Sequence, residues 1–221
     1  VPDVRLRAGA RKVVYVLDVP ELGGGVKVVF QHASLLAERG HEVAVFGRGA
    51  RPAWAAFEGR YVDTRRRFAR REPADLAVAT YYTTAGTVGR LVRAPIAHFC
   101  QGYEGDLAHL AAERPRIEAI YRRDLPTLVV APHLADMLER RFGRRSALAP
   151  PALDPLFAPA PARRPPRRPR VVVPGIFEAE VKNVATALRA VLAVRRAGTD
   201  CELVRISTLP LSAAERAIVE P

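Results

Sequence analysis

Apolar and polar positions follow two alternating periods through the first 150 residues. Val13–Val19 is rich in β-branched residues and predicts a buried strand. The next apolar positions return every three or four residues, which predicts a helix over Val26–Arg39 that ends at Gly40. His41–Phe46 repeats the strand pattern. Buried strands separated by crossover helices indicate an α/β fold, a Rossmann-like parallel sheet with helices on both faces.

The same alternation continues to residue 149. Pro115 lies inside one expected helix and must kink or divide it, because proline lacks an N–H and clashes with the preceding turn. Gly143 follows the last of these helices as its C′ residue. The further elements expected are strands at Asp75–Thr80, Ile96–Cys100, Thr127–Ala131 and Ser146–Ala149, and helices at Thr84–Val92, Asp106–Arg122 and His133–Phe142.

A stretch rich in proline and arginine, residues 151–170, interrupts the pattern and predicts an extended, semi-rigid linker. The sequence therefore divides into a Rossmann-like N-terminal domain at 1–150, this hinge linker, and the beginning of a similar C-terminal domain at 171–221, which we expect to be truncated. The elements expected in the last part are strand Val171–Pro174, a turn at Gly175, helix Val184–Arg196 and strand Cys201–Ile206.

Composition restricts the class of protein. The chain has 221 residues, of which 49% are hydrophobic, and no apolar run reaches the roughly 18–20 residues of a membrane span. Cys100 and Cys201 lie in apolar runs without metal-ligand spacing, so we expect buried free thiols and a reducing, cytoplasmic location. No metal and no cofactor are expected. Met137 is the only methionine, so residue 1 is not an encoded start.

The formal net charge of +12 raises the question of an anionic partner. The basic residues gather at 60–71 and 163–170, within a chain that is generally rich in Arg, Ala and Pro. Runs of this kind usually form a solvated face or a linker. Contact with anionic membrane headgroups is the second interpretation. Nucleic acid is the least favoured, because only Phe68 offers an interleaved aromatic ring for base stacking.

Three glycines, Gly23, Gly24 and Gly25, separate the first strand from its helix. A glycine loop at a helix N-terminus lets phosphate oxygens approach bare backbone N–H groups, where the helix dipole favours negative charge. A flexible turn is the alternative, since the spacing is not the G-x-G-x-x-G of dinucleotide-binding proteins. An oxidoreductase would also place an acidic residue after the second strand, where Gly47-Arg48 stands.

Four stretches carry a resemblance to a known family: the glycine loop with its helix and the following "…L…RGHEV" segment at 36–43, the segment Gln101-Gly102-Tyr103-Glu104, and the segments at 151–159 and 175–183. Together they resemble the N-terminal domain and the start of the C-terminal domain of a GT-B glycosyltransferase of the family 4 type. Gln101-Gly102-Tyr103-Glu104 is similar to a Gln-Asp-Tyr-Glu sequence of a rhamnosyltransferase-like subgroup. The segment at 151–159 resembles the family's hinge, and the segment at 175–183 resembles its donor loop with one extra residue and no arginine.

This resemblance implies an enzyme with two Rossmann-like domains facing each other across a cleft. It would transfer a hexosyl or deoxyhexosyl group from a nucleotide-sugar to a saccharide or lipid-linked acceptor, with retention of configuration, in bacterial polysaccharide biosynthesis. The first domain would select the acceptor. The basic clusters would then rest on the anionic inner face of a membrane. The alternatives are another nucleotide-binding Rossmann protein and a basic module that binds nucleic acid or an anionic surface.

The resemblance also assigns candidate site residues. Lys182 matches the lysine that meets the donor phosphates, although a solvated lysine is the alternative. Gly23, Gly24 and Gly25 would face the donor or acceptor. Gln101, Tyr103 and Glu104 would contact the substrate at the end of a strand, and Gln101 and Glu104 are the only catalytic candidates. An amide cannot act as a general base, so Gln101 would hydrogen-bond a sugar hydroxyl or be structural, and Glu104 would bind sugar or pair with an arginine.

Other polar residues remain ambiguous. Tyr81 and Tyr82 either line an acceptor groove or pack, and His98 is expected in the core. The E-x7-E motif that holds the donor in this family is absent before Pro221. Residues 1–221 alone are therefore expected to bind donor poorly and to turn over little.

Overall fold

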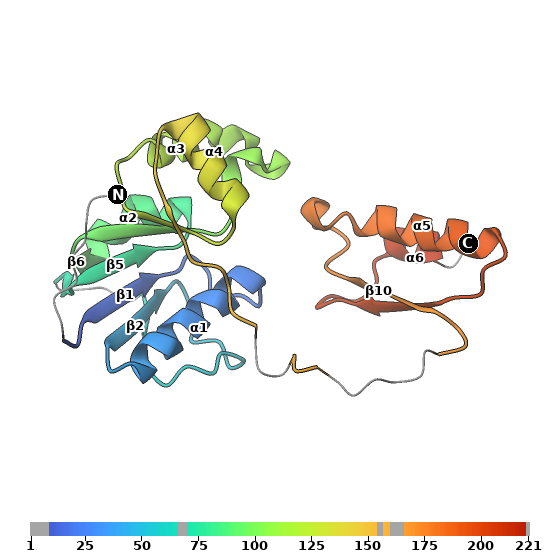
Figure 1. The fold of residues 1–221 in the computed structure, drawn as a ribbon, viewed down its shortest axis with the longest axis horizontal. Helices are drawn as coiled ribbons and strands as arrows, with labels where there is room; N and C mark the ends of the chain where they lie inside the picture. Colours follow the sequence, from blue (N-terminus) through green and yellow to red (C-terminus); the bar gives the residue numbers. More distant parts are fainter. Residues whose placement is uncertain (1–8, 66–69, 154–156, 160–165, 220–221) are drawn as a thin grey trace. The chain divides into compact units, whose positions relative to one another are not determined.

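The computed structural model describes residues 9–65, 70–153, 157–159 and 166–219. The chain divides into two compact units, Val1–Asp154 and Pro155–Pro221 (Figure 1). Of the expected linker, residues 154–156 and 160–165 lie outside the described residues, and its described residues up to 169 carry no helix or strand. The domain boundaries given by the sequence stay a prediction.

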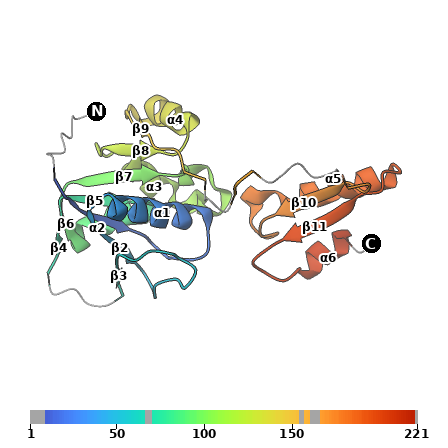
Figure 2. The same cartoon turned by 60° about the horizontal axis from the view of Figure 1, so that its bottom comes forward.

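A parallel sheet of seven strands forms the first unit, in the order β3-β2-β1-β5-β7-β8-β9 (Figure 2). β-Branched and small apolar residues fill the central strands, which are buried on both faces. The expected α/β, Rossmann-like fold is confirmed. The strands are β1 Lys12–Val16, β2 Glu42–Gly47, β3 Arg60–Asp63, β5 Leu76–Ala79, β7 Ile96–Cys100, β8 Thr127–Val129 and β9 Ala147–Leu148.

Helices cover both faces of this sheet. On one face, α1 (Gly24–Glu38) buries Val29, Phe30 and Ala33 against the odd-numbered side chains of β1. On the other face, α2 (Tyr82–Leu91) packs on β5, and α3 (Arg114–Tyr121) and α4 (Pro132–Phe142) pack near the end of β7 (Figure 1). Apolar residues three and four apart give each helix the stripe that it buries.

Two local expectations were wrong. α1 begins at Gly24 rather than at residue 26, so two of the three glycines lie in its first turn. The helix expected over Asp106–Arg122 is two 3-10 segments, η1 (Glu104–Asp106) and η2 (Ala108–Glu113), followed by α3. The expectation that Pro115 divides this helix is confirmed: Pro115 lies in the first turn of α3, where its missing N–H costs nothing.

The start of the basic segment at 60–71 forms β3, an edge strand that the sequence did not indicate. Residues 66–69 of that segment lie outside the described residues. A separate two-stranded sheet joins β4 (Glu72–Pro73) and β6 (Val92–Arg93) in parallel. It too was not expected from the sequence.

The second unit is a βαβ arrangement with an additional helix. β10 (Arg170–Pro174) pairs in parallel with β11 (Glu202–Ile206), and α5 (Val184–Arg196) connects them. A 3-10 segment, η3 (Glu180–Lys182), precedes α5, and α6 (Ala213–Val219) follows β11. Arg205 of β11 and the buried Glu215 of α6 form an ion pair with an N–O distance of 2.5 Å.

Among the described residues, no helix is both long enough and apolar enough to cross a membrane. Both cysteines are free and buried, as the sequence predicted.

Candidate functional site

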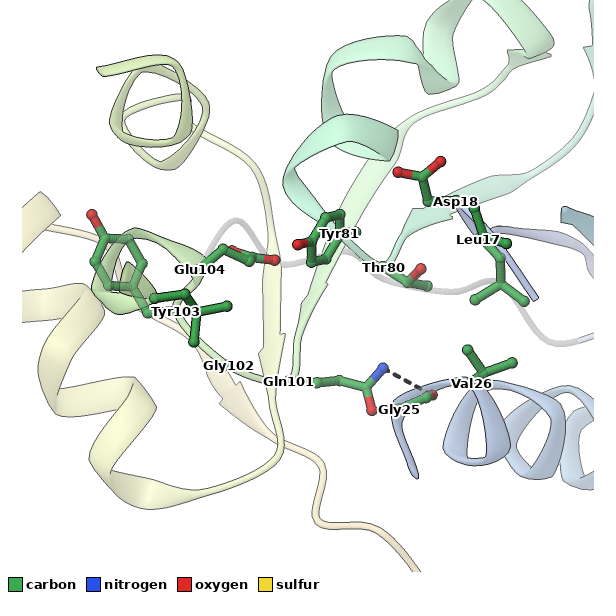
Figure 3. Close-up of a pocket in the computed structure, with 12 residues that line it drawn as sticks. Leu17, Asp18, Gly25, Val26, Thr80, Tyr81, Gln101, Gly102, Tyr103 and Glu104 are labelled. Atoms are coloured by element: carbon green, nitrogen blue, oxygen red, sulfur yellow. Dashed lines mark hydrogen bonds between the residues drawn. The ribbon is translucent and has the colours of Figure 1, made fainter. Parts of the chain in front are cut away.

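A pocket of about 500 Å³ opens at the carboxyl edge of the seven-stranded sheet (Figure 3). Its walls come from the segments that follow β1, β5 and β7, and from the first turn of α1. It is lined by Leu17, Asp18, Val19, Gly25, Val26, Thr80, Tyr81, Gln101, Gly102, Tyr103, Glu104 and Leu107.

The strand order explains why the pocket lies at this place. β1 pairs with β2 on one side and with β5 on the other. The chain after β1 passes through α1 to β2, whereas the chain after β5 passes through α2 to β7, in the opposite direction along the sheet. The connections after β1 and β5 therefore diverge and leave a crevice between them. In open parallel sheets, ligands bind at such a switch point, outside the carboxyl ends of the strands.

Asp18 follows β1 and is held by a residue of α2. The hydroxyl of Thr83 donates a hydrogen bond of 2.7 Å to Oδ2 of Asp18, and the side chain of Asp18 is half-buried. Behind it, Thr80 Oγ1 donates to the Val16 carbonyl at 2.9 Å. Thr84 Oγ1 accepts the Tyr81 N–H at 2.9 Å, which fixes the start of α2. These contacts give the Asp18 carboxylate a defined position at the rim.

Gln101 closes the opposite side of the pocket. Its Nε2 donates a hydrogen bond of 3.0 Å to the carbonyl of Gly25 (Figure 3). A Cβ at position 25 would lie only 3.3 Å from that nitrogen, so the close approach favours glycine. Gly23 has ordinary extended backbone (φ −164°), and a Cβ at position 24 would meet open space. Of the three glycines, only Gly25 therefore has a steric reason to lack a side chain.

Glu104 lies on the far wall with its carboxylate buried. The phenol of Tyr121 donates to Oε2 of Glu104 at 2.6 Å, and the backbone amide of Tyr82 also faces the carboxylate. Burial raises the pKa of Glu104, and these hydrogen bonds oppose the rise. Among the described residues a tyrosine holds Glu104, and no ion pair of Glu104 with an arginine is formed there.

Two tyrosines flank this carboxylate differently. Tyr81 points its hydroxyl toward Glu104 (Figure 3), and burial, with the nearby charges of Glu104 and Asp18, raises its pKa to about 12. The ring of Tyr103 turns away from Gln101 (Figure 3) and meets Tyr121 edge-on at 4.9 Å. Tyr81 is thus a polar wall of the pocket, whereas the ring of Tyr103 mainly packs.

The charge of the lining is negative. Asp18 and Glu104 are the charged side chains among its twelve residues, and none of the twelve is Lys, Arg or His. Beside the pocket, α1 begins without a side-chain cap: its N-cap residue, Gly23, offers no side-chain hydrogen bond. The N–H groups of the first turn are exposed there, and these favour negative charge. An acidic pocket, which disfavours anions, therefore lies next to a helix N-terminus, which favours them.

The structure brings four of the expected site residues together in one pocket. Gly25, Gln101, Tyr103 and Glu104 line the pocket. Gly23 and Gly24 are exposed at the start of α1 and do not line it. Lys182 belongs to the second unit, where it is exposed at the end of η3.

Sequence reasoning missed Asp18 as a site residue and Thr83 as its partner. One signal was available: Asp18 directly follows a buried strand, at the end where parallel sheets place ligands.

His98 and Cys100 lie on the inner face of β7, beneath α3. His98 is buried, as expected, and its ring meets Tyr121 edge-on at 5.2 Å. Burial and the nearby Arg144 guanidinium lower the pKa of His98 to about 3. Burial raises the pKa of the Cys100 thiol to about 11. A neutral imidazole and a protonated thiol are groups of the core, not of the pocket.

No group of three or more His, Cys, Asp or Glu side chains that could hold a metal ion occurs in the part of the chain that the structure describes. The expectation that the protein uses no metal stays a prediction.

No protein-family model matches the sequence, and no curated protein matches it significantly. A solved structure does share the fold. The catalytic domain of Starch Synthase IV from Arabidopsis thaliana, bound to ADP and acarbose, superposes with a TM-score of 0.54 at 12% identity, over 91% of this chain and 70% of that chain. The glycotransferase of kitacinnamycin gives a TM-score of 0.47 at 14% identity, over 89% of this chain and 65% of that chain. The present chain therefore spans about two thirds of either protein.

Proposed function

We propose that the chain belongs to a GT-B glycosyltransferase that transfers a sugar from a nucleotide-sugar donor to an acceptor held in the first unit. One observation carries the proposal: the pocket at the switch point of the sheet lies beside the uncapped N-terminus of α1. The two neighbouring environments match the two substrates of such a reaction, an anionic donor and a less polar acceptor. The shared fold with starch synthase IV supports this proposal.

The donor would place its phosphates near the first turn of α1. Exposed N–H groups at a helix N-terminus bind phosphate oxygens and stabilise the charge that develops on a departing nucleoside diphosphate. Starch synthase IV was solved with ADP bound, which supports a nucleoside diphosphate as the leaving group here. Lys182 remains our proposal for a cation that meets the donor phosphates from the second unit.

The acceptor would lie in the pocket between Gln101 and Asp18. The Asp18 carboxylate accepts only one hydrogen bond from described residues, so it retains lone pairs for an acceptor hydroxyl. Gln101 would border the acceptor near the α1 turn, where its amide already holds the Gly25 carbonyl. Binding both substrates side by side contributes to the rate through proximity and orientation. Retention of configuration and a saccharide or lipid-linked acceptor remain proposals based on the sequence.

Binding is the direct test. The chain, uniformly labelled with 15N, is titrated with UDP-glucose, GDP-mannose, ADP-glucose and dTDP-rhamnose at millimolar concentration. We expect at least one nucleotide-sugar to shift the amide resonances of residues 24–26. If every donor leaves these amides unmoved, the proposal is wrong. NAD serves as the control for the oxidoreductase alternative, and we expect it to have no effect, since β2 ends at Gly47 with Arg48 following rather than with an acidic residue.

A further inference from the structure

The apolar lining of the pocket sets the size and character of its ligand. Aliphatic side chains of Leu17, Val19, Val26 and Leu107 and the ring of Tyr81 make up most of its wall. A pocket of about 500 Å³ is in the range that holds a drug-sized molecule, and burying apolar surface is the main favourable contribution to its binding. This environment suits the body of a ring-containing molecule better than a phosphate-rich one.

The two charged side chains of the pocket, Asp18 and Glu104, accept hydrogen bonds. Asp18 Oδ2 accepts from Thr83, and no other donor meets the Asp18 carboxylate among the residues that the structure describes. Glu104 already accepts hydrogen bonds from Tyr121 and the Tyr82 amide, so its carboxylate has fewer free lone pairs for a ligand than that of Asp18. In a largely apolar wall, an anionic ligand group would be repelled by both carboxylates, and a hydroxyl or ammonium group would be attracted.

We infer that the pocket selects an acceptor with an apolar ring and a neutral or cationic hydrogen-bond donor, and that Asp18, oriented by Thr83, receives that donor. Phosphate- or carboxylate-bearing acceptors are excluded by the same charges. That this ligand is a sugar acceptor rests on the function proposed above, but the preference of the pocket for such a ligand does not require sugar transfer. This class differs from the saccharide or lipid-linked acceptors that the sequence implied.

The Asp18–Thr83 pair determines which variants report on this preference. Asp18→Asn keeps the shape of the side chain and removes its charge. Thr83→Val keeps the shape of Thr83 and removes the hydroxyl that donates to Asp18 Oδ2. Thr83 is therefore a positioning residue, and its loss should weaken binding of the hydrogen-bond donor without reversing the charge preference. Asp136→Asn is the matched control, because Asp136 is exposed on α4, away from the pocket lining.

Three probes share one phenol ring and differ in the group at the end of a short chain: tyramine carries an ammonium, tyrosol a hydroxyl, and 4-hydroxyphenylacetate a carboxylate. Each is titrated into the 15N-labelled chain, and the amides of residues 17–19 and 101–104 report binding. We expect tyramine and tyrosol to bind at least about tenfold more tightly than the carboxylate. Asp18→Asn should abolish most of the tyramine preference, whereas Asp136→Asn should leave it intact.

Equal affinity for the carboxylate, or an unchanged preference in a folded Asp18→Asn protein, would overturn the inference. Thermal unfolding of each variant establishes whether it is folded. If the Asp18→Asn protein is not folded, Thr83→Val provides a second, milder perturbation of the same site. Failure here is distinguishable from failure of the proposed function. Nucleotide-sugar shifts at residues 24–26 without a probe preference would contradict only the inference, and a probe preference without any nucleotide-sugar binding would contradict only the glycosyltransferase proposal.

Discussion

The phenol of Tyr121 donates a 2.6 Å hydrogen bond to the carboxylate of Glu104, and both side chains are buried. The bond ties the last turn of α3 to the segment behind β7, which forms one wall of the pocket. Glu104 is thereby held by a neutral donor, and this hydrogen bond opposes the rise in the pKa of Glu104 that burial causes. This arrangement makes the core and the pocket wall interdependent.

Replacing Tyr121 by phenylalanine should remove that donor and leave a buried carboxylate oxygen without it. We expect the pKa of Glu104 to rise above its value in the parent protein, because the hydrogen bond favours the charged form. Stability at neutral pH should fall by about 1–3 kcal/mol. Carbon-detected NMR titration gives the pKa, and urea unfolding gives the stability.

Tyr103→Phe is the matched control for that substitution, because the Tyr103 side chain is only partly buried and its ring keeps the same packing. A Tyr121→Phe protein with an unchanged Glu104 pKa would show that the phenol does not hold the charge.

His98 should make the protein sensitive to acid. Its ring nitrogens have no hydrogen-bond partner among the described residues, and its pKa is lowered to about 3. A histidine with a lowered folded-state pKa contributes stability that is present above its ordinary pKa of about 6.5 and is lost as the pH falls below it. We expect the parent protein to lose stability relative to His98→Leu by roughly 1 kcal/mol for each pH unit between 6 and 4.

Urea unfolding at several pH values measures this difference in slope, which is independent of any packing change that the leucine introduces. His109→Leu, at an exposed position in η2, is the control and should leave the slope unchanged. Parallel pH profiles for the parent and His98→Leu would refute the prediction.

Arg144 should be a major stabilising residue of the first unit. Its guanidinium is buried and donates to the Tyr121 carbonyl at 3.1 Å, to the Leu125 carbonyl at 2.6 Å and to Thr127 Oγ1. Arg144→Met keeps most of the packing but leaves these acceptors without their donor, so we expect a loss of about 2–4 kcal/mol in the free energy of unfolding. Arg145→Met, at the exposed neighbouring position, should change it by less than about 0.5 kcal/mol. Similar losses in both variants would contradict this reading.

Gly24 and Gly25 form a matched pair in the first turn of α1. A methyl group at Gly24 meets open space, so Gly24→Ala should raise the stability by about 0.5 kcal/mol through helix propensity. At Gly25 the methyl group would press on the Gln101 amide, so Gly25→Ala should gain less and should weaken tyrosol binding in the pocket. Calorimetric melting and the tyrosol titration measure both effects. If Gly24→Ala weakens tyrosol binding as much as Gly25→Ala does, the close approach between Gly25 and Gln101 is not the cause of the weaker binding.

The regular elements could be predicted where burial determines the pattern. Ile96–Cys100 and Val184–Arg196 were predicted to the residue, because a strand buried on both faces and a helix with one buried stripe leave clear periods. β3 was missed because it is an edge strand: Arg60 and Asp63 interrupt its apolar positions, and its side chains are only partly buried. A basic segment at a sheet edge gives the same pattern as a solvated loop.

The pocket could be predicted only in part. Gly25 and Gln101 were candidates, yet their contact spans 76 residues of sequence and depends on how β1, β5 and β7 are ordered in the sheet. Asp18 and Thr83 lie 65 residues apart and meet for the same reason. Strand order is a property of the whole sheet, so local patterns do not contain it. The charge of the pocket comes from Asp18, which follows β1, and Glu104, which follows β7. It could therefore not be predicted from the sequence around either residue alone.

The central position of β1 has a consequence for synthesis. β1 is synthesised before the other strands of its sheet, and β2 can pair with it soon afterwards, but its other neighbour, β5, begins only at Leu76. The wall that carries Gln101 and Glu104 follows later still. A nascent chain that stops before residue 76 therefore exposes one edge of β1 and has no pocket. Ligand binding can report the completion of this unit but cannot assist its early folding.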